Sequence, residues 1–178
     1  MRRFILTVCA LLGGVALSAQ TIAYKGVEVT LGPRALYVDG SLSAAEAARS
    51  PYIFNSFNEA MGHLQDGTRE APMRVYIAPW VYWVDDPDDG QVRRGVNGAA
   101  PFGMVVRCQA LQLLGMTEDA HDAVLASARD QTQGAVGNFT MFDFWGDDLV
   151  FKDLTMGQRR YWCWRDHRGC RQPRGDGR

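Results

Sequence analysis

Short segments in which apolar and polar residues alternate recur along most of this chain, separated by glycine, proline or aspartate. The pattern is strongest in residues 131–156, where aromatic and aliphatic residues lie on either side of a Gly146-Asp147 corner. Successive strand side chains point to opposite faces, so apolar groups on both faces predict short strands covered on both sides. Gly146 permits a backbone turn that a residue with a Cβ resists. Such corners are typical of a stacked β-solenoid, in which each turn of chain buries itself against its neighbours.

The same pattern predicts further strands nearer the amino terminus. We expect them at 27–31, 35–38, 73–78, 81–84, 104–114 and 123–126. Gly32-Pro33, between the first two, fits a short hairpin or an added edge strand. Short strands with such corners favour a parallel β-helix, and a β-sandwich is the alternative.

One segment has helical periodicity instead. Ser56 and Glu59 have the spacing of a capping box, in which each side chain bonds a free backbone N–H of the first helical turn. An apolar face then repeats at helical spacing through Phe57, Ala60, Met61 and Leu64. Asp66-Gly67 closes this predicted helix, and the alanine-rich segment 41–49 predicts a second, brief one.

Residues 142–156, FDFWGDDLVFKDLTM, resemble the pectinesterase (pectin methylesterase) family, whose members share the pattern V-x-V-x-G-D-x-F-x-A-x-D-I-T-F. Gly146-Asp147 and Asp153-Leu154-Thr155 fall at the matching places. Upstream, residues 75–82 (VYIAPWVY) resemble the family's strand followed by GxY, with Trp80 in place of the usual glycine.

This resemblance covers residues 50–157 and implies an all-β fold, a right-handed parallel β-helix. The β-helix is expected to be incomplete, with the predicted 57–64 helix as its amino-terminal cap. The parent activity it implies is hydrolysis of pectin methyl esters, which releases methanol and uses no metal or organic cofactor. It also implies substrate contacts from polar positions near the sugar groove, which are Gln131, Gln133, Asn138 and Thr140.

Ester hydrolysis in this family is assigned to one carboxylate nucleophile, one carboxyl acid/base and donors for the oxyanion. Those groups belong to turns that follow the segment matched here by residues 150–156. The text after Gly157, QRRYWCWRDHRGCRQPRGDGR, contains no QAVAL-, DTL-, DFIFG- or LGRPW-like segment, so no catalytic residue is assigned. Three aspartates near the corner have structural interpretations instead: Asp147 and Asp148 flank a turn, and Asp153 faces outward in a strand.

The composition changes abruptly at the same point. Residues up to Gly157 include 12 basic and 18 acidic side chains, whereas 158–178 contain seven arginines, two aspartates and no lysine; the net charge of the whole chain is −1. A break of this kind marks a boundary. We interpret 158–178 as an out-of-frame or truncated continuation, with a genuine basic tail that binds an anionic polymer as the alternative.

The amino terminus has the features of an export signal, with Arg2 and Arg3, an apolar stretch at 4–17 and Ser18-Ala19 as a small-residue cleavage site. The apolar stretch is short for a membrane span, so no stable membrane insertion is expected after cleavage of residues 1–19. We therefore expect a secreted or periplasmic protein whose β-helix occupies residues 20–157. Export argues against nucleic acid as a partner, and the resemblance to pectinesterases implies pectin or a related polygalacturonide.

Other reactive side chains carry weaker signals. The three histidines, His63, His121 and His167, have no metal-ligand spacing. A zinc site at Cys163, His167 and Cys170 would need a fourth ligand, and Asp166 is the one candidate nearby. Whether Cys163 and Cys170 form a disulfide is left undecided, because spacing alone cannot establish the pairing.

Two further features have ordinary structural interpretations. The acidic segment 85–90 holds four carboxylates, but its register does not fit an EF-hand, so a solvated loop is expected rather than a calcium site. Cys108 is expected to be a small buried apolar residue rather than a reactive thiol.

The sequence thus predicts a truncated pectinesterase-like protein that is inactive in this form, and leaves open whether it is an enzyme at all. A non-catalytic carbohydrate-binding or surface β-solenoid is the alternative. An uncovered last turn would leave strand edges unpaired, which predicts self-association through that end.

Overall fold

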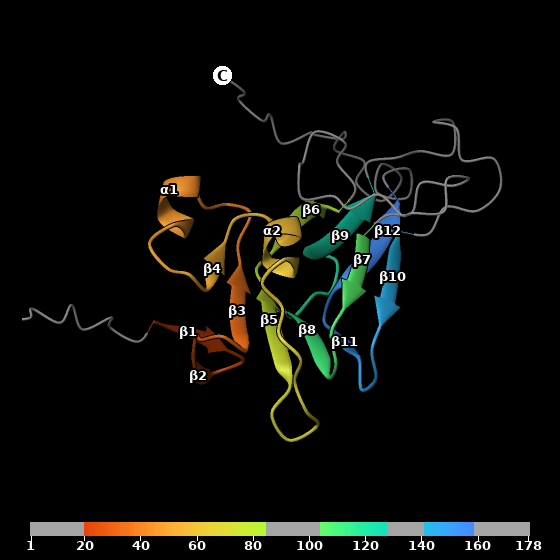
Figure 1. The fold of residues 1–178 in the computed structure, drawn as a ribbon. Helices are drawn as coiled ribbons and strands as arrows, with labels where there is room; N and C mark the ends of the chain where they lie inside the picture. The colour runs from red at the N-terminus through yellow and green to blue at the C-terminus, as the bar shows by residue number, and fades with distance from the viewer. Residues whose placement is uncertain (1–19, 85–103, 128–140, 159–178) are drawn as a thin grey trace, which may run out of the picture.

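The computed structural model describes residues 20–84, 104–127 and 141–158, and short strands are its main regular secondary structure (Figure 1). The strands are β1 (Thr21–Tyr24), β2 (Val27–Thr30), β3 (Ala35–Val38), β4 (Ile53–Phe54), β5 (Met73–Ile77), β6 (Trp80–Trp83), β7 (Met104–Arg107), β8 (Leu111–Gly115), β9 (Ala123–Ser127), β10 (Phe142–Trp145), β11 (Val150–Lys152) and β12 (Thr155–Gln158). The helices are α1 (Ala44–Ala47) and α2 (Phe57–Met61). The expected predominance of strands is confirmed.

Most strands pair in parallel, in three sheets. One sheet has the order β11-β8-β5-β3-β4, a second has the order β12-β9-β6, and the third pairs β10 with β7. The succession β7, β8, β9 is repeated by β10, β11, β12, and each later strand pairs with its counterpart in the preceding turn of chain. Parallel pairing of this kind does not fit the β-sandwich alternative, whose sheets are antiparallel.

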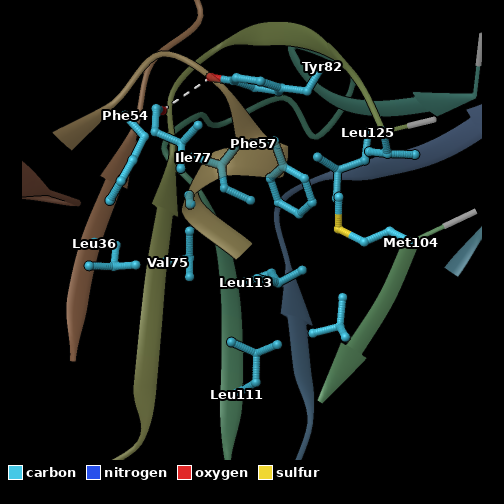
Figure 2. Close-up of a cluster of buried hydrophobic side chains, with 14 of the residues drawn as sticks. Leu36, Phe54, Phe57, Val75, Ile77, Tyr82, Met104, Leu111, Leu113 and Leu125 are labelled. Carbon is cyan, nitrogen blue, oxygen red and sulfur yellow. Dashed lines mark hydrogen bonds between the residues drawn. The ribbon is translucent and has the colours of Figure 1, made fainter. Parts of the chain in front are cut away.

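The core lies between the three sheets and is built from register columns. Leu36 pairs with Val75, and Val75 with Leu113, so these three side chains stack one above another on the inner face of the five-stranded sheet. Each of them is at most 1% exposed. Figure 2 shows these side chains directed into a common interior with Leu125 from the facing sheet.

Tyr82 is the polar member of this interior. Its ring packs near Phe57, with centroids 6.3 Å apart, and its hydroxyl lies 3.0 Å from the carbonyl oxygen of Ala78 and 3.1 Å from that of Val38. The same hydroxyl oxygen accepts a hydrogen bond from the N–H of Gly40 at 3.2 Å. These hydrogen bonds offset the cost of burying the hydroxyl group. They also connect β6 to the end of β3.

Both helices form, but α2 is shorter than predicted. It ends at Met61 with Gly62 as its C-cap, so Leu64 and the Asp66-Gly67 pair lie beyond it. The Ser56 hydroxyl accepts from the N–H of Glu59, as expected. A complete reciprocal capping box is present at α1, between Ser43 and Glu46.

The position of α2 also differs from a simple end cap. In chain order it precedes β5 and β6 as β7 precedes β8 and β9, so it takes the place of the first strand in its turn. Phe57 reaches the core, 2% exposed, and its ring lies 6.1 Å from that of Phe142 in the last described turn. The helix therefore forms part of the wall of the core, and it also contacts β3 and β4.

Of the two arrangements predicted for residues 27–38, a short hairpin or an added edge strand, the hairpin between 27–31 and 35–38 does not form. Strand β2 pairs antiparallel with β1, and β3 joins the parallel sheet. Lys25 and Gly26 form the two-residue turn, both with positive φ (49° and 79°), which is the geometry that short hairpins favour.

This hairpin covers part of the outer face of the five-stranded sheet. Val75 and Ile77 point into the core, so Tyr76 points outward, and yet it is only 4% exposed because Tyr24 packs against it with ring centroids 5.1 Å apart. At the turn, Lys25 Nζ lies 2.6 Å from Asp153 Oδ2 in the last described turn of chain. The hairpin thus connects the first part of the fold to the last.

Candidate functional site

The best candidate site is the outer face of the two-stranded sheet formed by β7 and β10. Met104 and Val106 are buried, at 4% and 3% exposure, and their register partners Phe142 and Phe144 pack against the core. The alternate positions therefore face outward. Those outward positions are Val105, Arg107, Asp143 and Trp145, and Trp145 pairs in register with Arg107.

Trp145 dominates this face. It is 57% exposed, an unusual state for so large an apolar side chain. The Arg107 guanidinium carbon lies 4.9 Å from the centroid of its ring, within range of a cation–π contact. Its indole Nε1 donates to Asp143 Oδ2 at 2.9 Å. Arg107 and Asp143 together hold the exposed ring in one orientation, so a ligand that stacks on it would find it already ordered.

The corner that follows Trp145 is fastened to the corner one turn earlier. A Cβ at Gly146 would lie 2.0 Å from the carbonyl oxygen of Cys108, so only glycine allows this approach. The N–H of Asp147 donates to Gln109 Oε1 at 2.9 Å, and its carbonyl oxygen accepts from the N–H of Ala110 at 2.9 Å. The predicted Gly-Asp corner is confirmed, and it positions Trp145 at the end of β10.

An ion pair anchors the same corner from outside. Arg69 donates to both carboxylate oxygens of Asp148, at 2.8 and 3.4 Å, and this contact raises the pKa of the guanidinium further above its usual value. Asp148 has a φ of 54°, as Ala110 has 49° at the equivalent place one turn earlier. Asp147 and Asp148 thus have the structural roles predicted for them.

Asp153 differs from its prediction. It lies between β11 and β12 rather than in a strand, with a φ of 54°, and its carboxylate pairs with Lys25. The hydrogen bond from Lys25 to Asp153 raises the pKa of the ammonium. Sequence reasoning missed this partner because the amino-terminal hairpin was not assigned correctly.

The four predicted substrate contacts, Gln131, Gln133, Asn138 and Thr140, lie outside the described residues. So do the acidic segment 85–90, His167, Cys163 and Cys170. Thr140 immediately precedes Met141, where the description resumes before β10.

The remaining candidates have structural surroundings. His63 packs against Phe54 with ring centroids 4.9 Å apart, and His121 Nδ1 lies 3.1 Å from Thr155 Oγ1. Within residues 20–84, 104–127 and 141–158, no three histidine, cysteine, aspartate or glutamate side chains gather as metal ligands would. In the same segments, no helix has the length and apolar character needed to cross a membrane.

Cys108 is buried, as predicted, at 3% exposure, with its Sγ 3.3 Å from the carbonyl oxygen of Gln65. Burial, assisted by the nearby Asp66 carboxylate, raises the pKa of its thiol to about 11. The thiolate is the nucleophilic form of cysteine. Cys108 is therefore unreactive for two reasons: reagents cannot reach the buried sulfur, and the thiol stays protonated.

We expect iodoacetamide at about pH 8 to leave Cys108 unmodified in the folded protein and to alkylate it in urea. Mass spectrometry of the peptide that contains Cys108 measures this directly. Because the folded state holds the thiol proton to higher pH than the unfolded chain does, the free energy of unfolding should also fall as pH rises from about 9 towards about 11. Rapid alkylation of Cys108 without denaturant would contradict the burial described above.

Comparison of the chain with protein-family models, curated proteins and solved structures finds no match. The function is therefore inferred from the site itself and from the sequence resemblance. The sequence pattern could have indicated the site, since Asp143 and Trp145 are two residues apart in a short strand and so share a face. The contribution of Arg107 depends on the register between β7 and β10, which sequence spacing does not fix.

Proposed function

We propose that this protein is a pectinesterase-like right-handed parallel β-helix that binds pectic polysaccharide on the outer face of β7 and β10 and does not hydrolyse it. The observation that carries the proposal is the exposed Trp145 ring held between Arg107 and Asp143. The repeated parallel turns support a β-helix, and the resemblance of residues 142–156 supports the choice of ligand.

The chemistry of this face suits an acidic sugar polymer. An exposed indole offers a flat apolar surface to the C–H face of a pyranose ring, together with a polar edge. Arg107 has five N–H donors in a planar fork that matches a carboxylate, so it can pair with a galacturonate that stacks on the neighbouring Trp145. Asp143 accepts from the indole and can also accept from a sugar hydroxyl.

Among the described residues, the outward positions of β7 and β10 do not supply the arrangement that ester hydrolysis needs. A carboxylate nucleophile and a separate carboxyl acid/base must both reach the ester. Among the described outward residues of β7 and β10, Asp143 is the one carboxylate, and it already accepts the indole N–H. We therefore assign binding without turnover, outside the cytoplasm, in keeping with the export signal expected at residues 1–19.

Trp145→Ala should weaken binding to polygalacturonate by about tenfold or more, because it removes the stacking surface of the site. Isothermal titration calorimetry at fixed ionic strength measures the change. Trp80→Ala is the matched control, since Trp80 is also exposed, at 37%, and belongs to a different sheet. Equal losses in the two variants would place the binding site elsewhere.

Arg107→Gln separates charge recognition from stacking. It should reduce binding to polygalacturonate and lessen its salt dependence, with a smaller effect on highly methyl-esterified pectin, which carries few carboxylates. Methanol release from the esterified pectin, compared with a heat-denatured sample, tests the absence of turnover in the same preparations. Release well above that control would overturn the non-catalytic assignment.

A further inference from the structure

Three successive corners of the fold are joined by side chains that accept hydrogen bonds from the next corner. The corners lie at Asp66, Gln109 and Asp147, ahead of β5, β8 and β11 of the five-stranded sheet. Asp66 Oδ1 accepts from the backbone N–H of Gln109 at 2.9 Å. Gln109 Oε1 accepts from the backbone N–H of Asp147 at 2.9 Å. We call these three residues the corner ladder.

Backbone hydrogen bonds run in the opposite direction between the same corners. The N–H of Gly67 donates to the carbonyl oxygen of Gln109 at 2.9 Å, and the N–H of Ala110 donates to that of Asp147 at 2.9 Å. The same two bonds therefore occur between both pairs of corners. Asp66 and Gln109 are exposed, so packing does not account for their side chains, whereas the need for an acceptor does.

The first member of the corner ladder belongs to the loop between α2 and β5, residues 62–72, which is yellow in Figure 1. Thr68 and Ala71 close its tip, since the backbone N–H of each donates to the carbonyl oxygen of the other at 3.1 Å. Arg69, within this tip, pairs with Asp148. The arginine side chain is 79% exposed, and exposed ion pairs contribute little and weaken with salt. The loop therefore holds the last of the three corners mainly through the corner ladder.

The corner ladder ends two residues from the tryptophan of the binding face. Gly146 lies between Asp147 and Trp145, and without a Cβ it can take several backbone conformations. On one side of it, the carbonyl oxygen of Trp145 accepts from the N–H of Cys108 at 3.1 Å. On the other side, Gln109 holds the N–H of Asp147. With both sides fixed, the end of β10 has one backbone direction, and the indole has one position on the outer face.

We propose that Gln109 is a positioning residue for the binding face at Trp145, and that Asp66 acts through it from the loop 62–72. The role of both side chains is to fix the corner that carries the indole, and not to contact the sugar. For its effect on affinity, this inference rests on the binding function proposed above. Its effect on the indole can be measured without a ligand.

Fluorine NMR of the full chain labelled with fluorotryptophan follows the indole directly, and the Trp145 signal is identified by its loss in Trp145→Phe. Gln109→Met removes the acceptor and keeps the length of the side chain. We expect it to shift and broaden the Trp145 signal while the Trp80 signal stays in place. Gln112→Met is the matched control: the Gln112 amide bonds Arg74 instead of a corner, so this variant should leave the Trp145 signal unchanged.

Asp66 supplies a second, independent pair of variants. Asp66→Ala should change the Trp145 signal in the same direction as Gln109→Met but by less, because it acts one corner further away. Asp66→Asn keeps an acceptor oxygen and should preserve the wild-type signal. A general loss of stability would move several tryptophan signals together, and thermal melts of all the variants detect it separately.

Calorimetric titration with polygalacturonate measures the effect on affinity. Gln109→Met should weaken binding about threefold, in line with the net contribution of one hydrogen bond, and Gln112→Met should bind as the wild type does. If the wild type does not bind, the proposed function fails, and the fluorine spectra still decide whether the corner ladder holds the indole. If the wild type binds and Gln109→Met changes neither the Trp145 signal nor the affinity, the positioning role is overturned and the binding function stands. Equal changes in the two glutamine variants would overturn the positioning role as well.

Discussion

Leu113→Ala should lower the free energy of unfolding by about 2–5 kcal/mol, the usual cost of removing a buried leucine side chain and leaving a cavity. Leu113 is fully buried in β8, an inner strand that pairs with β5 on one side and β11 on the other. Neither neighbouring turn can move into the space without breaking its own ladder, so we expect a value in the upper part of this range. Urea denaturation followed by circular dichroism gives the midpoint and slope from which the change is obtained.

Val27→Ala is the control for this measurement. Val27 is 64% exposed in β2, so its truncation should change the free energy of unfolding by less than about 0.5 kcal/mol. Similar values for the two variants would mean that Leu113 does not lie in the interior of three sheets.

Gly115→Ala should cost about 3 kcal/mol, at the upper end of what an overpacked site usually costs. A Cβ at this position would lie 1.7 Å from the carbonyl oxygen of Asp153. Gly115 belongs to β8, and Asp153 lies between β11 and β12, so the clash is between two paired parts of the backbone. Relief requires the corner between β11 and β12 to move away from β8. The Lys25–Asp153 pair resists that movement, and the same denaturation experiment measures the loss of stability.

Gly32→Ala is a suitable partner for that test. Nothing lies within 4 Å of a Cβ built at Gly32, so this substitution should be nearly neutral. If both glycines tolerate alanine equally, the close stacking of the last turn on β8 is not present in solution.

Sequence reasoning identified most strands because their residues alternate and their corners contain glycine or aspartate. Gly146 is the clearest case: its neighbours predicted a corner, and the structure has one where Cys108 approaches too closely for any side chain. Helix α2 was also recognised from Ser56 and Glu59, although its end was placed too late, because Leu64 continued the apolar spacing after the backbone had left the helix. Periodicity reports which residues are apolar and not where the hydrogen bonds stop.

The hairpin and the site were harder to predict, for a common reason. Strand β1 is short, and its pairing with β2 depends on the Lys25-Gly26 turn, a two-residue signal that competes with the nearby Gly32-Pro33 break. Likewise, Arg107 meets Trp145 only because β7 and β10 align in one register. Contacts between successive turns depend on the number of residues in each turn. Loops of different length make that number irregular, so the register cannot be read from the sequence.

The ion pair at the tip of the hairpin has a consequence for how the molecule assembles. Lys25 is made early in synthesis, and Asp153 is made after nearly all of the described chain, so their contact closes a very long loop and cannot help to start folding. Turns of chain can stack in order from β3 onward, but the hairpin finds its full docking surface only when β11 and β12 are in place. Its complete docking therefore belongs to the last stage of folding, and a molecule that lacks its final turn holds the hairpin by the Tyr24–Tyr76 contact without the ion pair.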